Sequence, residues 1–250
     1  MMRFLTPAVL AVALLAAPAR ALDLTAMTES ERAAFRAEVR AYLLDNPEII
    51  MEAVGLLEQR QAMAEAAADT ALIADNADAL FDDGHSWVGG NPDGDITLVE
   101  FMDYRCGFCR KAAPEVEALL KSDGNIRLIV KEFPILGEAS LVSSQFALAT
   151  KEVAGDAAYA QVHEALIAFK GDVDEVALRR LANGLGLDAD TIMAQMDSPD
   201  IRRILKENHD LAKRLNISGT PTFVLEDEML RGYLPADQMA QIVEQKRARR

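Results

Sequence analysis

The chain contains two cysteines, which stand two residues apart as Cys106 and Cys109 in the stretch FMDYRCGFCRKAAPEVEALL, residues 101–120. A disulfide stabilises a fold most when it closes a long loop, and this pair would close almost none. Stability is therefore a poor explanation of the pair, and reactivity is a better one. We expect no zinc site, because a second pair of ligands is needed and the three histidines show no clustered spacing.

The chemistry of the pair depends on the helix that we expect to begin at Cys106. Unpaired N–H groups and the positive end of the helix dipole favour a thiolate there over a thiol. Cys109 would lie one turn further in and be more buried, within reach of a mixed disulfide on Cys106. We therefore predict that Cys106 is the nucleophile and Cys109 the resolving thiol, with their redox-active disulfide and no other cofactor. Two thiolates could instead hold Cu(I), or the pair could be inert.

Glu100 lies in the apolar run ITLVEF, residues 96–101, six residues before Cys106. A buried carboxylate is costly unless it has a partner or a task. One hypothesis is that Glu100 relays protons to and from Cys109 and has a raised pKa. The alternative is a solvated position at the edge of a strand.

Pro221 opens a strand-like run in ISGTPTF, residues 217–223. Proline is excluded from central strands, and a cis bond between Thr220 and Pro221 would resolve the conflict by forming a tight corner. The backbone of Thr220 would then be open to a substrate strand. An ordinary trans turn is the alternative.

Residues 96–101 and 126–133 read as strands, and the helix between them makes a strand–helix–strand unit, which favours a parallel pair. Residues 84–95 form a turn-rich linker before this unit. From residue 138 to about 215 the chain is helical in several pieces, which predicts a helical insertion. A return to β character and a last helix over 235–247 complete the pattern.

Residues 28–80 are strongly helical, beginning at a capping box from Thr28 to Glu31. Further along, Ile50, Val54 and Leu57 form an apolar stripe that needs a cover. The cover is either the body of the same chain or a second copy, and we expect a homo-oligomer through 28–80.

Residues 1–21 have a basic start, an apolar stretch and a small-x-small motif at Ala19–Ala21, which together are typical of a secretory signal peptide. We expect export to the periplasm as a soluble protein, where a disulfide can persist. The formal net charge of −14 argues against nucleic acid as a partner. The predicted organisation is a signal peptide (1–21), a helical segment (22–83) and an α/β domain (84–250).

Taken together, FMDYRCGFCRKAAPEVEALL, KEFPILG and GTPTF resemble the DsbA-type branch of thioredoxin-fold thiol-disulfide oxidoreductases, over about residues 86–247. The resemblance implies a thioredoxin-like fold with a helical insertion, a cis-proline carried onto Pro221 after Thr220, and an acid at Glu100. Residues 35–61 resemble ScsC-type proteins linked to copper tolerance, some of which oligomerise and act as disulfide isomerases. Strongly oxidising relatives carry Pro-His between the cysteines, whereas this chain has Gly107-Phe108, so these two residues are expected to tune the potential.

The sequence therefore predicts an exported enzyme that exchanges disulfides with cysteine-containing exported proteins, as an isomerase or reductase rather than as an oxidase. Two alternatives stay open. One is a monomeric dithiol oxidase recharged by a membrane redox partner, and the other is a Cu(I)-binding module that uses the same thiolates.

Overall fold

The computed structural model describes residues 25–249, so the signal peptide predicted for residues 1–21 lies outside the described range. The chain forms two compact units, one up to Arg60 and the other from Gln61 onward. We had expected the boundary near 83/84. The structure draws it earlier because Ile73, near the end of helix α2 (Glu48–Asp75), and Leu80 in α3 (Ala77–Phe81) belong to the second hydrophobic cluster of the larger unit.

The first unit contains helix α1 (Glu29–Asp45) and the beginning of α2. The predicted capping box is present: the backbone N–H of Thr28 donates to the Glu31 carboxylate at 2.8 Å, and the N–H of Glu31 donates to the Thr28 hydroxyl at 3.3 Å. Helix α1 buries none of its side chains. The helical character expected over 28–80 is confirmed, with breaks near Asn46 and Asn76.

The second unit is built on a five-stranded sheet in the order β1-β3-β2-β4-β5. Its strands are β1 (Trp87–Gly90), β2 (Ile96–Met102), β3 (Ile126–Glu132), β4 (Thr222–Leu225) and β5 (Glu228–Arg231). Strands β2 and β3 are parallel and are joined through helix α4 (Gly107–Asp123), as predicted, while the other neighbours pair antiparallel. The fold is thus the expected α/β arrangement, and it places the two cysteines directly after the central strand.

Strand β1 corrects the interpretation of residues 84–95 as a linker. Trp87 pairs with Val130 and Val88 with Ile129, so this segment forms an edge of the sheet. Two of the four residues in β1 are glycines, and Gly90 has a positive φ of 64°. Glycine is depleted in strands, which explains why the sequence pattern concealed this short one.

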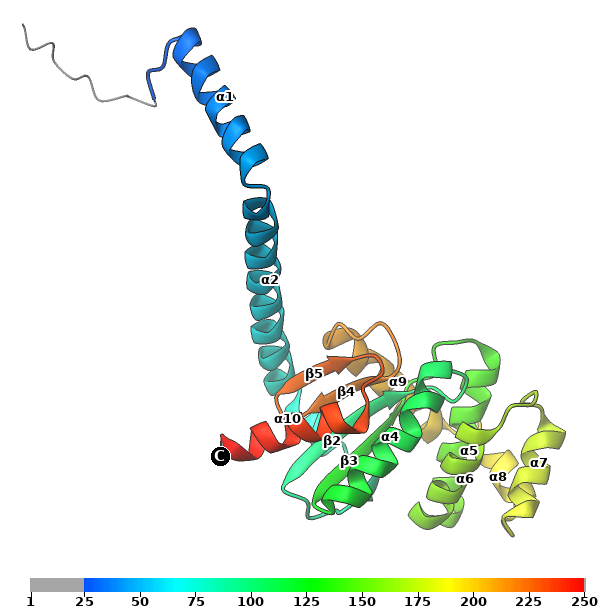
Figure 1. The fold of residues 1–250 in the computed structure, drawn as a ribbon. Helices are drawn as coiled ribbons and strands as arrows, with labels where there is room; N and C mark the ends of the chain where they lie inside the picture. Colours follow the sequence, from blue (N-terminus) through cyan, green and yellow to red (C-terminus); the bar gives the residue numbers. More distant parts are fainter. Residues whose placement is uncertain (1–24, 250) are drawn as a thin grey trace, which may run out of the picture. The chain divides into compact units, whose positions relative to one another are not determined.

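Helices cover both faces of the sheet (Figure 1). The predicted insertion consists of α5 (Glu138–Ala154), α6 (Asp156–Ala168), α7 (Glu175–Gly184), α8 (Ala189–Gln195) and α9 (Pro199–Arg214), and α10 (Ala236–Ala248) follows the last strand. Leu98 and Met102 of β2 pack in one cluster with Val116 of α4 and Met239 of α10. The alternate residues of the same strand pack in a second cluster with α3 and α9. A hydrophobic core therefore lies on each face of the sheet.

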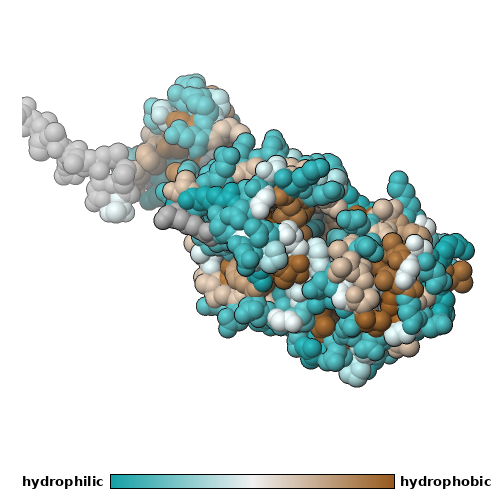
Figure 2. Space-filling model, turned by 90° about the horizontal axis from the view of Figure 1, so that it is seen from below, coloured by the Kyte–Doolittle hydropathy of each residue, from teal (hydrophilic) through white to brown (hydrophobic). Residues whose placement is uncertain are grey.

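Within residues 25–249, no helix is both long and apolar enough to cross a membrane. The face seen in Figure 2 is mostly hydrophilic, with separate hydrophobic areas between the charged ones.

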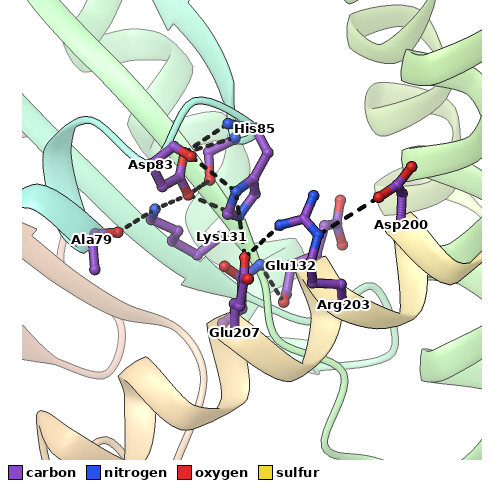
Figure 3. A network of polar contacts seen from close by, with 10 residues as sticks. Ala79, Asp83, His85, Lys131, Glu132, Asp200, Arg203 and Glu207 are labelled. Atoms are coloured by element: carbon purple, nitrogen blue, oxygen red, sulfur yellow. Dashed lines mark hydrogen bonds and ion pairs between the residues drawn. The ribbon is translucent and has the colours of Figure 1, made fainter.

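Lys131 is buried on the face of the sheet that packs against α3 and α9 (Figure 3). Its side chain is fully buried, donates to the carbonyl of Ala79 at 2.8 Å and forms an ion pair with Asp83. His85 Nε2 lies 2.9 Å from the same carboxylate. Burial works against ionisation of Asp83, but the hydrogen bonds from His85 and the charge of Lys131 outweigh it and hold the pKa of Asp83 well below its usual range. This pair fastens the loop before β1 to strand β3.

Replacing Asp83 by asparagine should destabilise the fold by about 3–5 kcal/mol at pH 7, because it leaves the Lys131 ammonium buried without an opposite charge. Urea unfolding measures the loss, and Asp82→Asn, the same change at the exposed neighbouring residue, is the matched control. A carboxylate with a depressed pKa stabilises the fold above its ordinary titration range. The difference between the wild type and Asp83→Asn should therefore shrink as the pH falls below about 4. Equal midpoints for both variants at pH 7 would contradict this assignment.

Candidate active site

Cys106 stands at the junction between β2 and α4, where it is the N-cap residue of the helix. Its residue is 7% exposed, and its Sγ donates to the backbone carbonyl of Thr220 at 3.2 Å. The first N–H groups of the helix have no partner within the helix, and they favour an anion at this end. The predicted position of Cys106 at the start of a helix is therefore confirmed, in a place suited to a nucleophilic sulfur.

Cys109 lies one turn into the same helix and is fully buried. Burial raises the pKa of its thiol far above the usual range, and the nearby carboxylate of Glu100 raises it further. A thiol in such a place needs a base before it can attack a disulfide. The two cysteines thus differ in the way that the predicted nucleophile and resolving thiol require.

Glu100 is placed in the centre of the sheet, where β2 pairs with β3 on one side and β4 on the other. It is 5% exposed, which rules out the alternative of a solvated edge position. Burial, followed by the charge of Glu132, raises the pKa of Glu100 to about 8. A carboxyl with this pKa can both take up and release a proton near neutral pH, so the prediction of a buried acid with a raised pKa is confirmed.

The bond between Thr220 and Pro221 is cis, as the sequence led us to expect. Strand β4 begins directly after it, and the carbonyl of Pro221 accepts from the N–H of Gly232 at 2.9 Å. The carbonyl of Thr220 faces the Cys106 sulfur from a segment more than a hundred residues away in the chain. The structure thus brings the predicted substrate-binding corner to the reactive cysteine.

Gly107 and Phe108 are both exposed, and 63% of Phe108 is open to solvent. A Cβ atom added at Gly107 would meet no other atom within 4 Å. The dipeptide between the cysteines therefore lies on the surface beside Cys106, with the side chain of Phe108 open to solvent. Its tuning of the potential stays a prediction.

Comparison with known proteins agrees with this geometry. The DSBA-like thioredoxin domain matches residues 97–244, and the N-terminal domain of the copper resistance protein ScsC matches residues 31–64. The chain belongs to the DsbA-like thioredoxin family. The chemistry of this family is thiol-disulfide exchange, and Cys106 and Cys109 are the cysteines that this sequence offers for it.

Solved structures similar to this DsbA-like chain include a thioredoxin-like oxidoreductase from Silicibacter pomeroyi. It is 38% identical, with a TM-score of 0.65, and the match covers 69% of this chain and 98% of that one. A linker-deletion variant of ScsC from Proteus mirabilis is 28% identical, with a TM-score of 0.67, and the match covers 91% of this chain and 100% of that one. Among curated relatives, the Na(+)/H(+) antiporter NhaA 1 of Salinispora arenicola is 31% identical over 137 residues, which are 54% of this chain. The chain spans only 21% of that relative's length.

The DsbA-like site also contains residues that the sequence reasoning missed. Asp103 is fully buried between β2 and α4, and its carboxylate accepts from the N–H groups of Arg105, Ile135 and Leu136 at 2.7, 2.9 and 3.1 Å. Its backbone carbonyl accepts from the N–H of Cys106 at 3.1 Å. Asp103 therefore ties the loop that carries the nucleophile to the loop after β3. The short spacing from Asp103 to Cys106 was the available signal, because aspartate commonly binds backbone N–H groups two residues further on.

Glu132 and Tyr104 were missed as well. Glu132 is 1% exposed and accepts a hydrogen bond of 2.8 Å from the hydroxyl of Tyr104, two residues before Cys106. The signal for Glu132 was present, since it is a carboxylate inside the apolar strand IRLIVKEF, as Glu100 is inside ITLVEF. Its partners come from separate elements, and spacing in the sequence does not identify them.

Replacing Cys109 by serine should trap mixed disulfides between Cys106 and substrate proteins, because the resolving thiol is lost. Replacing Cys106 should abolish exchange, because the accessible sulfur is removed. Mass spectrometry of the trapped adducts after digestion checks the assignment. Cys106→Ser under the same conditions is the control, and adducts joined through Cys109 would overturn the two roles.

Replacing Glu100 by glutamine should slow the resolving step by about 10²-fold, the effect typical of losing a proton-transfer group. In the wild type the rate should rise as the pH passes through about 8, because Glu100 then loses its proton and can accept that of Cys109. The variant should lack this inflection. Stopped-flow release of a chromogenic thiol from a mixed disulfide on Cys106 measures both effects. An unchanged profile would remove Glu100 from the reaction.

Proposed function

We propose that this chain is exported to the periplasm, where it acts as a disulfide isomerase or reductase on cysteine-containing exported proteins, working as a homo-oligomer. The proposal goes beyond thiol-disulfide exchange, which follows from the family. The observation that carries it is the large apolar surface that the first unit leaves exposed. Export rests on the sequence of residues 1–21 and on the nature of the relatives, since a disulfide persists in an oxidising compartment.

The first unit exposes large apolar side chains along both of its helices. Phe35, Val39 and Tyr42 of α1 are 46%, 41% and 55% exposed, and Ile50 and Leu57 of α2 are 51% and 57% exposed. A groove of about 430 Å³ in this unit is lined by the apolar Phe35, Val39, Leu43, Leu44 and Ile50, together with Arg36 and Arg40. Contiguous apolar surface of this kind marks an interaction site. The match to the ScsC N-terminal domain covers this same segment, which supports further copies of this chain as the cover.

An oligomer would favour isomerase work over simple oxidation. Several catalytic units held together face one misfolded substrate at a high effective concentration, so a mixed disulfide formed at one site is quickly met by another. The two alternatives make different demands. A monomeric dithiol oxidase recharged by a membrane redox partner needs a high reduction potential, and a copper module needs tight Cu(I) binding by Cys106 and Cys109.

Three measurements on the purified mature chain separate these functions. Light scattering gives the mass, equilibration with glutathione gives the reduction potential of the Cys106–Cys109 couple, and a scrambled disulfide protein gives isomerase activity. An oligomer with isomerase activity supports the proposal. A monomer with a high potential and no reshuffling activity replaces it by the oxidase, and submicromolar Cu(I) binding without exchange replaces it by the copper module.

Replacing Val54 by glutamate should reduce the mass to that of a monomer, because a charge in an apolar interface remains desolvated without a partner. Isomerase activity should fall by at least about tenfold with the loss of effective concentration, while oxidation of a short dithiol peptide stays unchanged. Light scattering and both activity assays measure these effects. Gln59→Glu adds the same charge at an exposed position on the opposite side of α2 and serves as the matched control. The proposal fails if both variants keep the wild-type mass, or if the wild type itself is a monomer at micromolar concentration.

A further inference from the structure

Glu132 lies on the same face of the sheet as Glu100. In the parallel pair of β2 and β3, Glu100 stands opposite Val130 and Met102 opposite Glu132, so the two glutamates are diagonal neighbours on adjacent strands. Diagonal neighbours in a sheet are close enough to interact through long side chains. Both residues are almost completely buried. Two carboxyl groups thus share one apolar interior beside Cys109.

The Glu132 carboxylate is held by three hydroxyl groups from three elements. Its Oε1 accepts from the Oη of Tyr104 at 2.8 Å and of Tyr159 in α6 at 2.6 Å, and its Oε2 accepts from the Oγ of Ser144 in α5 at 2.7 Å. An ionised carboxylate only accepts hydrogen bonds, so this arrangement suits its charged form. The donors are neutral, and they leave the negative charge of Glu132 to act on its neighbours.

The other polar and titratable groups packed around the pair are neutral or negative. His163 in α6 has its Nδ1 3.0 Å from the Tyr104 oxygen, which accepts from it because Tyr104 donates to Glu132. Burial lowers the pKa of His163 to about 4, so its ring is neutral at pH 7. Asp103 adds negative charge to the surroundings of Glu132. From α9, the amide of Asn208 donates to the backbone carbonyl of Glu132 at 3.1 Å.

A cavity of about 360 Å³ reaches this interior between the sheet, α4 and α6. Glu100 and His163 both line it, and the exposed Glu117 and Glu164 lie among its other lining residues. Glu100 therefore has a route for exchanging protons that does not pass the Cys106 sulfur. Glu132 does not line the cavity and is 1% exposed, so water screens its charge only weakly.

We propose that Glu132 is a positioning residue for disulfide exchange, whose charge governs how firmly Glu100 holds the proton that it trades with Cys109. In the resolving step the Cys109 thiol gives its proton to the Glu100 carboxylate, and its sulfur attacks Cys106 in the mixed disulfide. The bond between Cys106 and the substrate sulfur breaks as the Cys106–Cys109 bond forms. The substrate sulfur is reduced and leaves as a thiolate, Cys109 is oxidised, and Cys106 passes from one disulfide to the other.

The pKa values of Glu132 and Glu100 agree with this role. Burial raises the pKa of Glu132 to about 7 against the effect of its hydroxyl donors, and Glu132 in turn adds to the rise at Glu100. The pair releases its protons near neutral pH as a coupled system. Removing the charge of Glu132 removes a repulsion, so the pKa of Glu100 falls and Glu100 becomes a base at lower pH.

The test is the pH dependence of the resolving step in Glu132→Gln, measured on the full mature chain. Cys106 is first loaded with 5-thio-2-nitrobenzoate, and release of this chromophore by Cys109 is followed by stopped flow from pH 5 to 9. The inflection should move down by roughly one pH unit, as expected when a like charge is removed from a buried neighbour. The rate at the alkaline plateau should change little, because Glu100 and Cys109 are intact.

Two further variants make the result specific. Glu117→Gln removes an exposed carboxylate from the lining of the same cavity and should leave the inflection in place, because solvent screens that charge. Ser144→Ala deletes one donor to Glu132 and keeps every carboxyl group. It disfavours the ionised form of Glu132, so it should move the inflection in the same direction by a smaller amount. This variant also decides the question if Glu132→Gln does not fold.

A uniform loss of rate with the inflection at its wild-type pH, in Glu132→Gln or in Ser144→Ala, would show a purely structural role and overturn the proposal. The inference rests on thiol-disulfide exchange and not on the choice between isomerase and oxidase. A monomeric mass or absent reshuffling activity would therefore refute the proposed function while leaving this test intact. Failure of the wild type to release the chromophore would instead refute the resolving role of Cys109.

Discussion

Cys109 can react only if its proton leaves the hydrophobic core between the sheet and α4, and the rest of the site depends on this requirement. Burial favours the thiol form of Cys109, so a base must stand beside it. That base is buried as well, and burial also disfavours the ionised form of its carboxyl group, so its pKa rises. Glu100 meets both conditions with a pKa near 8, at which a carboxyl group exchanges protons at little cost around neutral pH. Cys106 is placed differently, at the N-cap of α4, where the unpaired N–H groups of a helix start favour an anion.

Strand β3 buries two ionisable residues next to each other, Lys131 and Glu132, and accommodates them in different ways. Side chains alternate along a strand, so Lys131 and Glu132 enter opposite faces of the sheet. Lys131 meets the opposite charge of Asp83, which cancels its field and makes the pair a structural fastening. Glu132 meets hydroxyl groups, which satisfy its hydrogen bonds and leave its charge uncancelled. Lys131 therefore acts on the carboxylate with which it pairs, whereas the uncancelled charge of Glu132 raises the pKa of Glu100 on the neighbouring strand.

Much of this arrangement could be predicted from the sequence because its signals are local. The CxxC spacing, the apolar strands and the proline at the start of β4 each lie within a few residues, and each identified its element. Strand β1 was hidden, because its pairing partner comes from β3 and its glycines suggest a turn. The boundary of the larger unit was placed too late, because the packing of Ile73 against the sheet leaves no mark in the sequence.

The cluster around Glu132 marks the limit of such prediction. Its residues come from the β2–α4 loop, β3, α5 and α6, so they meet only through tertiary packing. A buried acid in an apolar strand signals that partners exist, and Glu132 carries this signal as clearly as Glu100 does. The identity of the partners decides whether such an acid is structural or reactive, and that information lies in the fold alone.

The two units of the chain contribute different properties to the proposed activity. The groups that shift the pKa of Cys109 lie in the unit from Gln61 onward, together with the whole sheet; they are Asp103, Glu100, Cys106 and Thr220. The exposed apolar residues of α1 and of the beginning of α2 belong to the other unit, up to Arg60. They can change how many active sites one substrate meets. Reduction potential and isomerase activity are therefore separable in this molecule, since the first depends on bonds to the Cys106 sulfur and the second depends also on the number of copies held together.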